Sequence, residues 1–239
     1  IGVQQRLEEA LALVANEAVE VVCAGRTDTG VHASGQVVHF DTHSKRSERG
    51  WLLGVNSSLP DDVNVTWARI VDDEFHARFS ATARSYRYCI LNRLERSALY
   101  RDRAWWVYQP LDADAMHDAA QRLLGRHDFS AFRAAGCQAA TAAREILSIA
   151  VQREGDWFKV DVTANAFLQH MVRNIVGTLA TVGLGEQPGQ WVSEVLEGRD
   201  RKAAGIAAPS HGLTLVAVEY PASFGIPDAV NYGLPGAGC

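Results

Sequence analysis

A hairpin pattern in the second half of the chain sets the strongest limit on the fold. The strand-like runs 146–152 and 157–162 are separated by a turn at Glu154-Gly155-Asp156. Two strands joined by so short a turn pair antiparallel, because parallel strands need a crossover connection of a dozen residues or more. The pattern therefore favours a mostly antiparallel sheet over a doubly wound parallel one.

The rest of the chain mixes amphipathic helices with short strands. Apolar residues spaced three and four apart predict helices over 3–17, 112–125, 167–182 and 191–196. Further strands are predicted at 20–24, 36–40, 63–71, 86–91, 105–108 and 213–220. This order predicts an α+β protein with an N-terminal half, 1–108, and a C-terminal half, 109–239, that ends in a flexible Gly/Pro-rich tail from Ala222.

The composition excludes several classes of protein. The chain has 239 residues, 47% hydrophobic and 21% charged, with a net charge of -5, which is typical of a globular protein and not of a disordered or collagen-like one. No apolar run approaches the ~20 residues of a membrane helix, and no signal-peptide pattern is found. Four scattered cysteines lack the spacing of a zinc site or a disulfide framework. We therefore expect a cytoplasmic protein.

Basic residues gather in one stretch although the whole chain is acidic. Seven arginines and two acidic residues fall within 78–103, interleaved with three tyrosines and followed by two tryptophans. Guanidinium and aromatic groups in alternation suit phosphate contacts and base stacking. We interpret the stretch as a contact surface for RNA or DNA. The alternative is a solvated strand face in a chain that prefers arginine to lysine.

A glycine-rich loop carries the densest cluster of polar residues. The segment CAGRTDTGVHASGQVVHF, residues 23–40, has glycines on both sides of Arg26, Thr27 and Asp28. A turn aspartate that bonds to local amides explains Asp28 but not Arg26, so we favour a functional loop. A phosphate-binding P-loop is excluded, since Val31-His32 stands where lysine and serine or threonine are required.

The helix predicted over 167–182 contains one charged residue in an apolar surrounding. Arg173 is the only formally charged residue between Asn165 and Leu184. A guanidinium in such a position either pairs with a carboxylate or phosphate, or extends to the surface along its apolar stem. The sequence leaves both possibilities open.

The strand predicted at 86–91 alternates aromatic and basic residues. Tyr86 and Tyr88 are expected on one face of the strand and Arg87 on the other. Two interpretations are open. The tyrosines pack in a core, as strand tyrosines usually do, or they form a stacking and phosphate-binding surface together with Arg78, Arg84 and Arg87.

Four segments resemble the successive motifs of the tRNA pseudouridine synthase A family. They are AGRTDTGVHASGQVVHF, VNSSLPDDV, FHARFSATARSYRY and NAFLQHMVRNIVG, in the order and spacing of the family. The similarity extends from the first helix to LTLVAVEYP near the C-terminus. The resemblance implies a pseudouridine synthase fold, with two pseudo-symmetric α/β halves, a shared and mostly antiparallel central sheet, helices outside it and a basic cleft between the halves.

The resemblance also implies an activity. It predicts a homodimer that isomerises uridine to pseudouridine at positions 38–40 of the tRNA anticodon arm, without metal, organic cofactor or membrane association. Asp28 matches the catalytic aspartate, Tyr86 the active-site tyrosine and Arg173 the arginine that pairs with the aspartate. Whether Asp28 attacks the ribose or the base is left open. The predicted substrate contacts are Arg26, Thr27, Tyr86, Arg78, Arg84 and Arg87.

Two expectations qualify this assignment. The family pattern has roughly thirty further residues before the first helix, so we expect a fragment or a chain without the first family strand. The same arginine and tyrosine surface also suits a non-catalytic RNA-binding protein. A hydrolase acting on a glycosidic bond is a weaker alternative, because it needs a second carboxylate and the loop around Asp28 supplies none.

Overall fold

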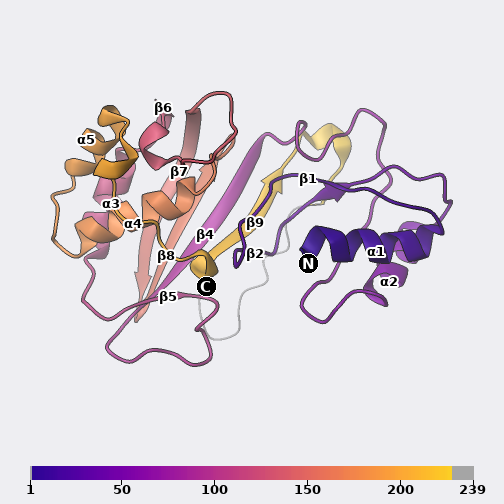
Figure 1. Ribbon diagram of the computed structural model, residues 1–239, viewed down its shortest axis with the longest axis horizontal. Coiled ribbons are helices and arrows are strands. Elements are labelled where there is room, and N and C mark those ends of the chain that lie inside the picture. Colours follow the sequence, from indigo (N-terminus) through magenta and orange to yellow (C-terminus); the bar gives the residue numbers. More distant parts are fainter. Residues whose placement is uncertain (1, 228–239) are drawn as a thin grey trace. The chain divides into compact units, whose positions relative to one another are not determined.

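The computed structural model describes residues 2–227 and divides them into two compact units, drawn in Figure 1. The smaller unit comprises the residues up to Arg26, Gln36–Ala81 and Tyr220–Pro227. The larger unit comprises Thr27–Gly35 and Thr82–Glu219. The chain therefore does not divide near the predicted boundary at residue 108. Strand β4 (Ala83–Asn92) lies before that boundary but pairs with two strands from after it, which joins both parts of the chain in one unit.

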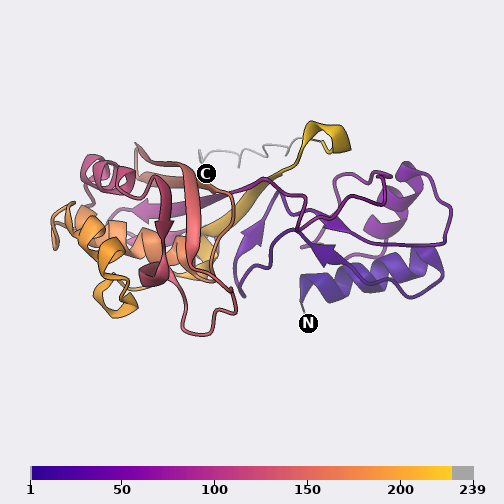
Figure 2. The same cartoon turned by 90° about the horizontal axis from the view of Figure 1, so that it is seen from above.

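Two helices and a small sheet form the smaller unit. Helices α1 (Val3–Ala15) and α2 (Glu48–Asn56) pack against each other (Figures 1 and 2). They share a core with residues from the neighbouring loops, and its buried members are Leu7, Ala10, Leu11, Ala15, Val19, Val21, Trp51 and Val55. Strands β1 (Val22–Cys23) and β3 (Val38–His39) pair antiparallel, within the ranges predicted for them.

Two elements of this unit differ from those predicted. Helix α2 was not predicted; it begins after Ser47, whose side chain accepts a hydrogen bond from the Gly50 N–H at 3.1 Å. The strand predicted at 63–71 was wrong, since the structure has none there. The side-chain amide of Asn56 instead bonds to both backbone groups of Val65, at 2.7 and 2.8 Å. The side chain takes the place that a neighbouring strand would have.

A seven-stranded sheet forms the larger unit. Its order is β2 (His32–Ala33), β9 (Leu213–Glu219), β4, β8 (Trp157–Ala164), β7 (Ala143–Glu154) and β6 (Gly125–Asp128), with β5 (Trp105–Val107) beside the end of β4 (Figure 1). Only the β2–β9 and β4–β5 pairs are parallel among the pairs in residues 2–227. The predicted α+β fold with a mostly antiparallel sheet is thus confirmed, and so is the β7–β8 hairpin.

Side chains of β8 alternate between two environments, as a half-covered strand requires. Phe158, Val160 and Val162 are buried, whereas Lys159 and Asp161 point to the other face and are partly exposed. Helix α3 (Ala113–Gln121) packs against β7 and against α4 (Met171–Gly183), and α5 (Trp191–Gly198) contacts β6. None of the helices in residues 2–227 is long and apolar enough to cross a membrane.

The predicted C-terminal tail has structure at its beginning. Residues Ala222–Phe224 form a short 3-10 helix, and the Phe224 ring packs edge-on against Phe75, with 5.3 Å between the centroids. The start of the predicted tail is therefore part of the smaller unit. The rest of it, from residue 228, lies outside the described residues.

Candidate active site

The segment Thr27–Gly35 carries the predicted catalytic aspartate and belongs to the larger unit. A β-turn begins at Asp28, where the Val31 N–H donates to the Asp28 carbonyl at 3.0 Å. Gly30, the third residue of this turn, has a φ of +83°, which favours glycine. A Cβ atom at this position would also lie 2.7 Å from the Ser210 hydroxyl oxygen. The backbone conformation strongly favours glycine here, and a larger residue would also displace the Ser210 hydroxyl.

Backbone bonds to β9 fix the end of the same segment. Strand β2 pairs with Thr214 and Leu215 of β9. The N–H groups of Ser34 and Gly35 both donate to the Leu215 carbonyl, at 2.9 and 3.1 Å. A Cβ atom on Gly35 would overlap the Val216 carbonyl oxygen. The Asp28 loop is therefore fixed by its backbone, independently of the contacts that its side chains make.

Arg173 in the first turn of α4 and His170 just before the helix approach the Asp28 carboxylate. The Arg173 Nη1 donates to Oδ2 of Asp28 at 3.2 Å, and the His170 Nε2 lies 3.3 Å from the same oxygen. The other oxygen, Oδ1, has no hydrogen-bond partner within residues 2–227. The Asp28 side chain is 28% exposed, so solvent or a ligand can reach it.

The Arg173 side chain is largely buried and is held by a second hydrogen bond. It is 16% exposed, and its Nε donates to the Ala208 carbonyl at 2.8 Å. The Ala208 N–H in turn donates to the Arg173 carbonyl at 3.0 Å. This close approach requires Gly177, one turn later in α4, because a Cβ atom there would overlap the Ile206 carbonyl oxygen. Of the two possibilities left open by the sequence, pairing with a carboxylate is the one found.

The β4 tyrosines lie on one face of the strand and Arg87 on the other, as predicted. The Tyr86 ring is buried edge-on against Phe167, with 5.0 Å between the ring centroids. Helix α4 begins at Met171, four residues later than predicted, so Phe167 belongs to the segment that leads into the helix. This segment therefore brings Tyr86 next to the chain that carries His170 and Arg173.

Tyr88 has a structural position behind this group. Its hydroxyl donates to the Pro209 carbonyl at 2.7 Å, beside the Ala208 carbonyl that holds Arg173. Burial raises the pKa of Tyr88 far above its ordinary value, so the phenol stays neutral. A neutral phenol that donates a hydrogen bond to the Pro209 carbonyl is suited to hold the segment around Ala208, and not to act as a base.

Two of the predicted substrate contacts in the larger unit have protein partners. Arg87 forms a two-point ion pair with Asp161 on the neighbouring strand, at 2.7 and 3.1 Å. Arg84 Nη1 donates to the Asn165 carbonyl at 3.0 Å. Thr27, next to Asp28, is exposed. The role of these residues in substrate binding stays a prediction.

The other two predicted substrate contacts, Arg26 and Arg78, lie in the smaller unit, where both are exposed. The Arg78 guanidinium lies over the Phe79 ring, 5.7 Å from its centroid. Phe79 is itself largely exposed. An exposed arginine on an aromatic ring suits contact with nucleotides, and that role also stays a prediction.

His170 is the residue of this site that the sequence analysis missed. The only signal was its spacing of three residues from Arg173, which places both side chains on one side of a helix end. Its contact with Asp28 depends on a backbone conformation that the sequence does not reveal.

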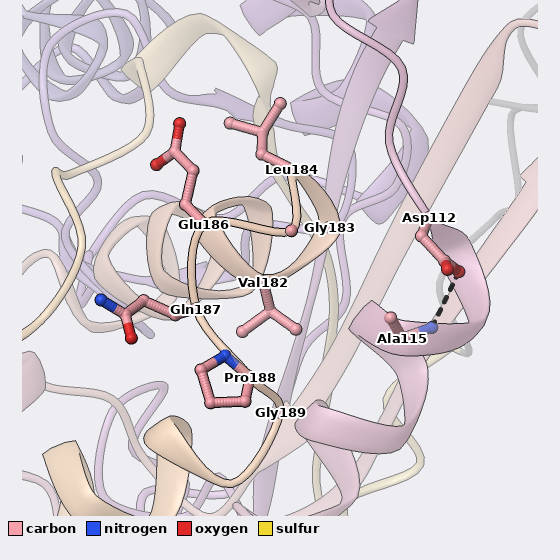
Figure 3. Close-up of a pocket in the computed structure, with 10 residues that line it drawn as sticks. Asp112, Ala115, Val182, Gly183, Leu184, Glu186, Gln187, Pro188 and Gly189 are labelled. Atoms are coloured by element: carbon pink, nitrogen blue, oxygen red, sulfur yellow. Dashed lines mark hydrogen bonds between the residues drawn. The ribbon is translucent and has the colours of Figure 1, made fainter.

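A separate hollow lies at the other end of α4. It has a volume of about 590 Å³ and is lined by Val182, Gly183, Glu186 and Pro188 together with Asp112 of the α3 N-terminus (Figure 3). None of the predicted site residues lines it. Since a helix rises about 1.5 Å per residue, Gly183 is about 15 Å along the axis from Arg173. The hollow therefore does not belong to the Asp28 site.

Fold and site together define the class of protein. A carboxylate on a glycine-dependent loop contacts an arginine from an apolar helix, in a unit built on a mostly antiparallel sheet. This is the arrangement implied by the motifs in the sequence. The family model described as tRNA pseudouridine synthase matches residues 2–80 and 119–221, which include Asp28 and Arg173. The chain belongs to this family, and pseudouridine synthases are isomerases.

Individual relatives cover nearly the whole chain. A protein of Pseudoalteromonas atlantica named tRNA pseudouridine synthase A is 56% identical over 227 residues, which are 95% of this chain and 86% of that protein. Proteins with the same name from Shewanella amazonensis and Xanthomonas axonopodis pv. citri are 56% and 55% identical, and cover 95% and 96% of this chain. These relatives confirm the resemblance of the four sequence motifs.

Proposed function

We propose that this chain converts uridine to pseudouridine in tRNA, at positions 38–40 of the anticodon arm. The names of its relatives and its family support this function. One observation in the site carries it. One Asp28 oxygen accepts a hydrogen bond from Arg173 and lies 3.3 Å from the His170 ring, and the other is open, on a loop whose backbone is fixed. A protein that only binds RNA has no need of such a carboxylate.

The reaction defines what the site must supply. The N1–C1′ bond of uridine breaks, the uracil rotates, and a new bond forms between C5 and C1′. A proton leaves C5 and N1 takes one up, so the product is an isomer and no electrons are gained or lost. An ionised carboxylate can start this sequence, by attack at C1′ or C6 or by removal of a ribose proton. We assign that role to Oδ1 of Asp28.

Arg173 keeps the carboxylate in place and compensates its charge through a charge-assisted hydrogen bond. Tyr86 stacks on the uracil, and its hydroxyl lies near the C5 proton that is lost. The target base must leave its stack before it can react, and Arg26 fills the space that it vacates. Thr27, Arg78, Arg84 and Arg87 contact the RNA, so binding weakens as the salt concentration rises.

We also propose that the enzyme is a homodimer and that it works in the cytoplasm. Both statements extend the family resemblance, and the second also follows from the location of the substrate. Light scattering at micromolar protein concentration measures the first directly. A mass of about 52 kDa, twice the 26.1 kDa of the chain, supports the dimer. A mass that stays at the monomer value contradicts it.

The function is tested by mapping modified uridines in a tRNA transcript that carries uridine at positions 38–40. After incubation with the chain, carbodiimide modification and primer extension locate pseudouridine at single-nucleotide resolution. We expect product at one or more of these positions, and none in a transcript with cytidine there. Asp28→Ala should abolish the product while tRNA binding persists. RNA binding without product would instead identify a non-catalytic RNA-binding protein.

A further inference from the structure

His170 has a backbone conformation that is unusual for its place. Its φ and ψ are 63° and 2°, in the left-handed region. The other two non-glycine residues with positive φ in residues 2–227, Asn16 and Arg199, both follow the last turn of a helix, where this conformation is common. His170 instead precedes the first turn of α4, a position that normally has an extended conformation.

The left-handed conformation is unfavourable for a residue with a Cβ atom, and it persists only where the surrounding structure enforces it. Several contacts do so here. The His170 carbonyl accepts the Asn174 N–H at 2.9 Å, and the Leu168 carbonyl accepts the Met171 N–H at 3.0 Å. The preceding residue, Gln169, accepts the Ala134 N–H at 3.0 Å. Residue 170 is thus held on both sides.

The consequence of this conformation is the position of the imidazole. Its Nε2 lies 3.3 Å from Oδ2 of Asp28, the oxygen that also accepts from Arg173. Arg173 makes a single contact with the carboxylate, and a carboxyl group with one contact still rotates, because the terminal torsion of aspartate is broad. The His170 ring, 3.3 Å from the same oxygen, is a second group that can restrict that rotation.

We propose that His170 is a positioning residue for Asp28. Its Nε2–H and the Arg173 guanidinium together hold Oδ2, so that Oδ1 is the oxygen presented to the substrate. The inference rests on the proposed function, in which Oδ1 acts on the uridine. In this proposal the left-handed backbone conformation of His170 directs its ring toward the Asp28 loop.

Three variants of the full chain separate the ring from the backbone. His170→Gln keeps an N–H donor at a similar reach. His170→Ala removes the donor and retains a Cβ atom. His170→Gly removes the donor and also relieves the backbone, since glycine adopts positive φ readily. The conversion of tRNA uridine gives kcat and KM for each variant, and thermal unfolding gives Tm.

We expect kcat to fall about tenfold in His170→Ala and His170→Gly, and less than about threefold in His170→Gln. KM should stay within about twofold of wild type in all three. The Tm of His170→Gly should equal or exceed that of wild type. A slower enzyme that is no less stable cannot be explained by a merely structural role. Full activity in His170→Gly would overturn the inference, whatever the result for His170→Ala.

A second measurement does not depend on activity. The ring proton resonances of His170, identified by their absence in His170→Gln, should shift in Asp28→Asn and stay unchanged in Asp161→Asn. An unaffected ring in Asp28→Asn would show that the contact is absent and refute the inference. Failure of the wild type to form pseudouridine would refute the proposed function but leave this contact open to measurement.

Discussion

Two of the arginine–aspartate pairs in the larger unit differ in how fully the carboxylate is paired. Arg87 and Asp161 lie opposite each other on β4 and β8, and two parallel hydrogen bonds of 2.7 and 3.1 Å occupy both carboxylate oxygens. Arg173 and Asp28 share one hydrogen bond of 3.2 Å, and Oδ1 stays open. The pair with the better geometry is the one that does not contain the proposed catalytic carboxylate. An incomplete pair suits a reactive carboxylate, because one of its oxygens can approach the substrate without first giving up a hydrogen bond to the protein.

The two pairs also differ in what else holds their members. Both residues of the Arg87–Asp161 pair belong to regular strands, whose ladder already fixes the backbone. Asp28 lies in a turn without such a ladder. The backbone hydrogen bonds of Ser34 and Gly35 to β9 hold this segment instead. The turn can therefore present a carboxylate that its ion pair does not fully occupy. Four experiments test this comparison, in order of expected effect.

The largest effect is expected from replacing Asp28 by asparagine. The side chain keeps its shape but loses its charge, so it can neither attack nor take a proton. We expect kcat/KM to fall at least about 1000-fold, measured as tritium release from tRNA labelled at C5 of uridine. The matched control is Asp161→Asn, which removes the carboxylate charge from the Arg87–Asp161 pair. It should lower kcat/KM less than about threefold. Equal losses in the two variants would erase the distinction between the pairs.

Arg173→Ala is expected to have the next largest effect. It removes the donor that holds Oδ2 and the contact with the Ala208 carbonyl. We expect kcat to fall about 100-fold with the Kd for tRNA within about threefold of wild type. Arg87→Ala gives the opposite pattern as a control, since Arg87 is a proposed RNA contact: the Kd for tRNA should rise while kcat changes less than about threefold. A parallel loss of kcat and affinity in Arg173→Ala would identify a phosphate contact instead of a partner for Asp28.

Much of the fold was predictable because its signals are local. The β7–β8 hairpin follows from alternation and a turn at Gly155, and α3 from an apolar stripe behind Asp112, whose side chain caps it at 3.0 Å. Helix α2 was missed because Gly50 and Gly54 weaken its helix propensity. Its stability comes from burial of one face against α1, a tertiary effect that no window of sequence contains.

The site was predictable in part, for the same kind of reason. Motifs indicated Asp28 and Arg173, but the residues alone left open whether the guanidinium had a partner, since the two are 145 positions apart. His170 could not be found, because its contact arises from a left-handed backbone. The strand predicted at 63–71 shows the converse error. Its apolar pattern is real, but the Asn56 side chain occupies the Val65 backbone groups.

A smaller effect is expected where the loop depends on its backbone. Gly30→Ala places a Cβ atom at positive φ and against the Ser210 hydroxyl, which can rotate away in part. We expect the free energy of unfolding to fall by about 1–2 kcal/mol in urea denaturation. The control is Gly198→Ala at the end of α5, where a Cβ atom meets nothing within 4 Å, and stability should stay within about 0.5 kcal/mol. A Gly30→Ala variant as stable as wild type would mean that the turn does not fix Asp28.

The smallest effect is expected for the Arg87–Asp161 pair itself, despite its ideal geometry. Its side chains are 30% and 37% exposed, so water and salt screen the attraction and both groups stay partly solvated in the folded protein. A double-mutant cycle of Arg87→Ala and Asp161→Ala, followed by urea unfolding, should give a coupling free energy of about 1 kcal/mol or less, and less again in 1 M salt.

A coupling free energy well above 2 kcal/mol that salt does not reduce would mean that the pair is desolvated. A fully paired carboxylate would then add much to the stability of this unit. Leaving Oδ1 of Asp28 unpaired would lower the free energy of unfolding by a similar amount. A small coupling free energy instead means that the unpaired Oδ1 hardly lowers the free energy of unfolding, because the neighbouring backbone hydrogen bonds already hold the loop.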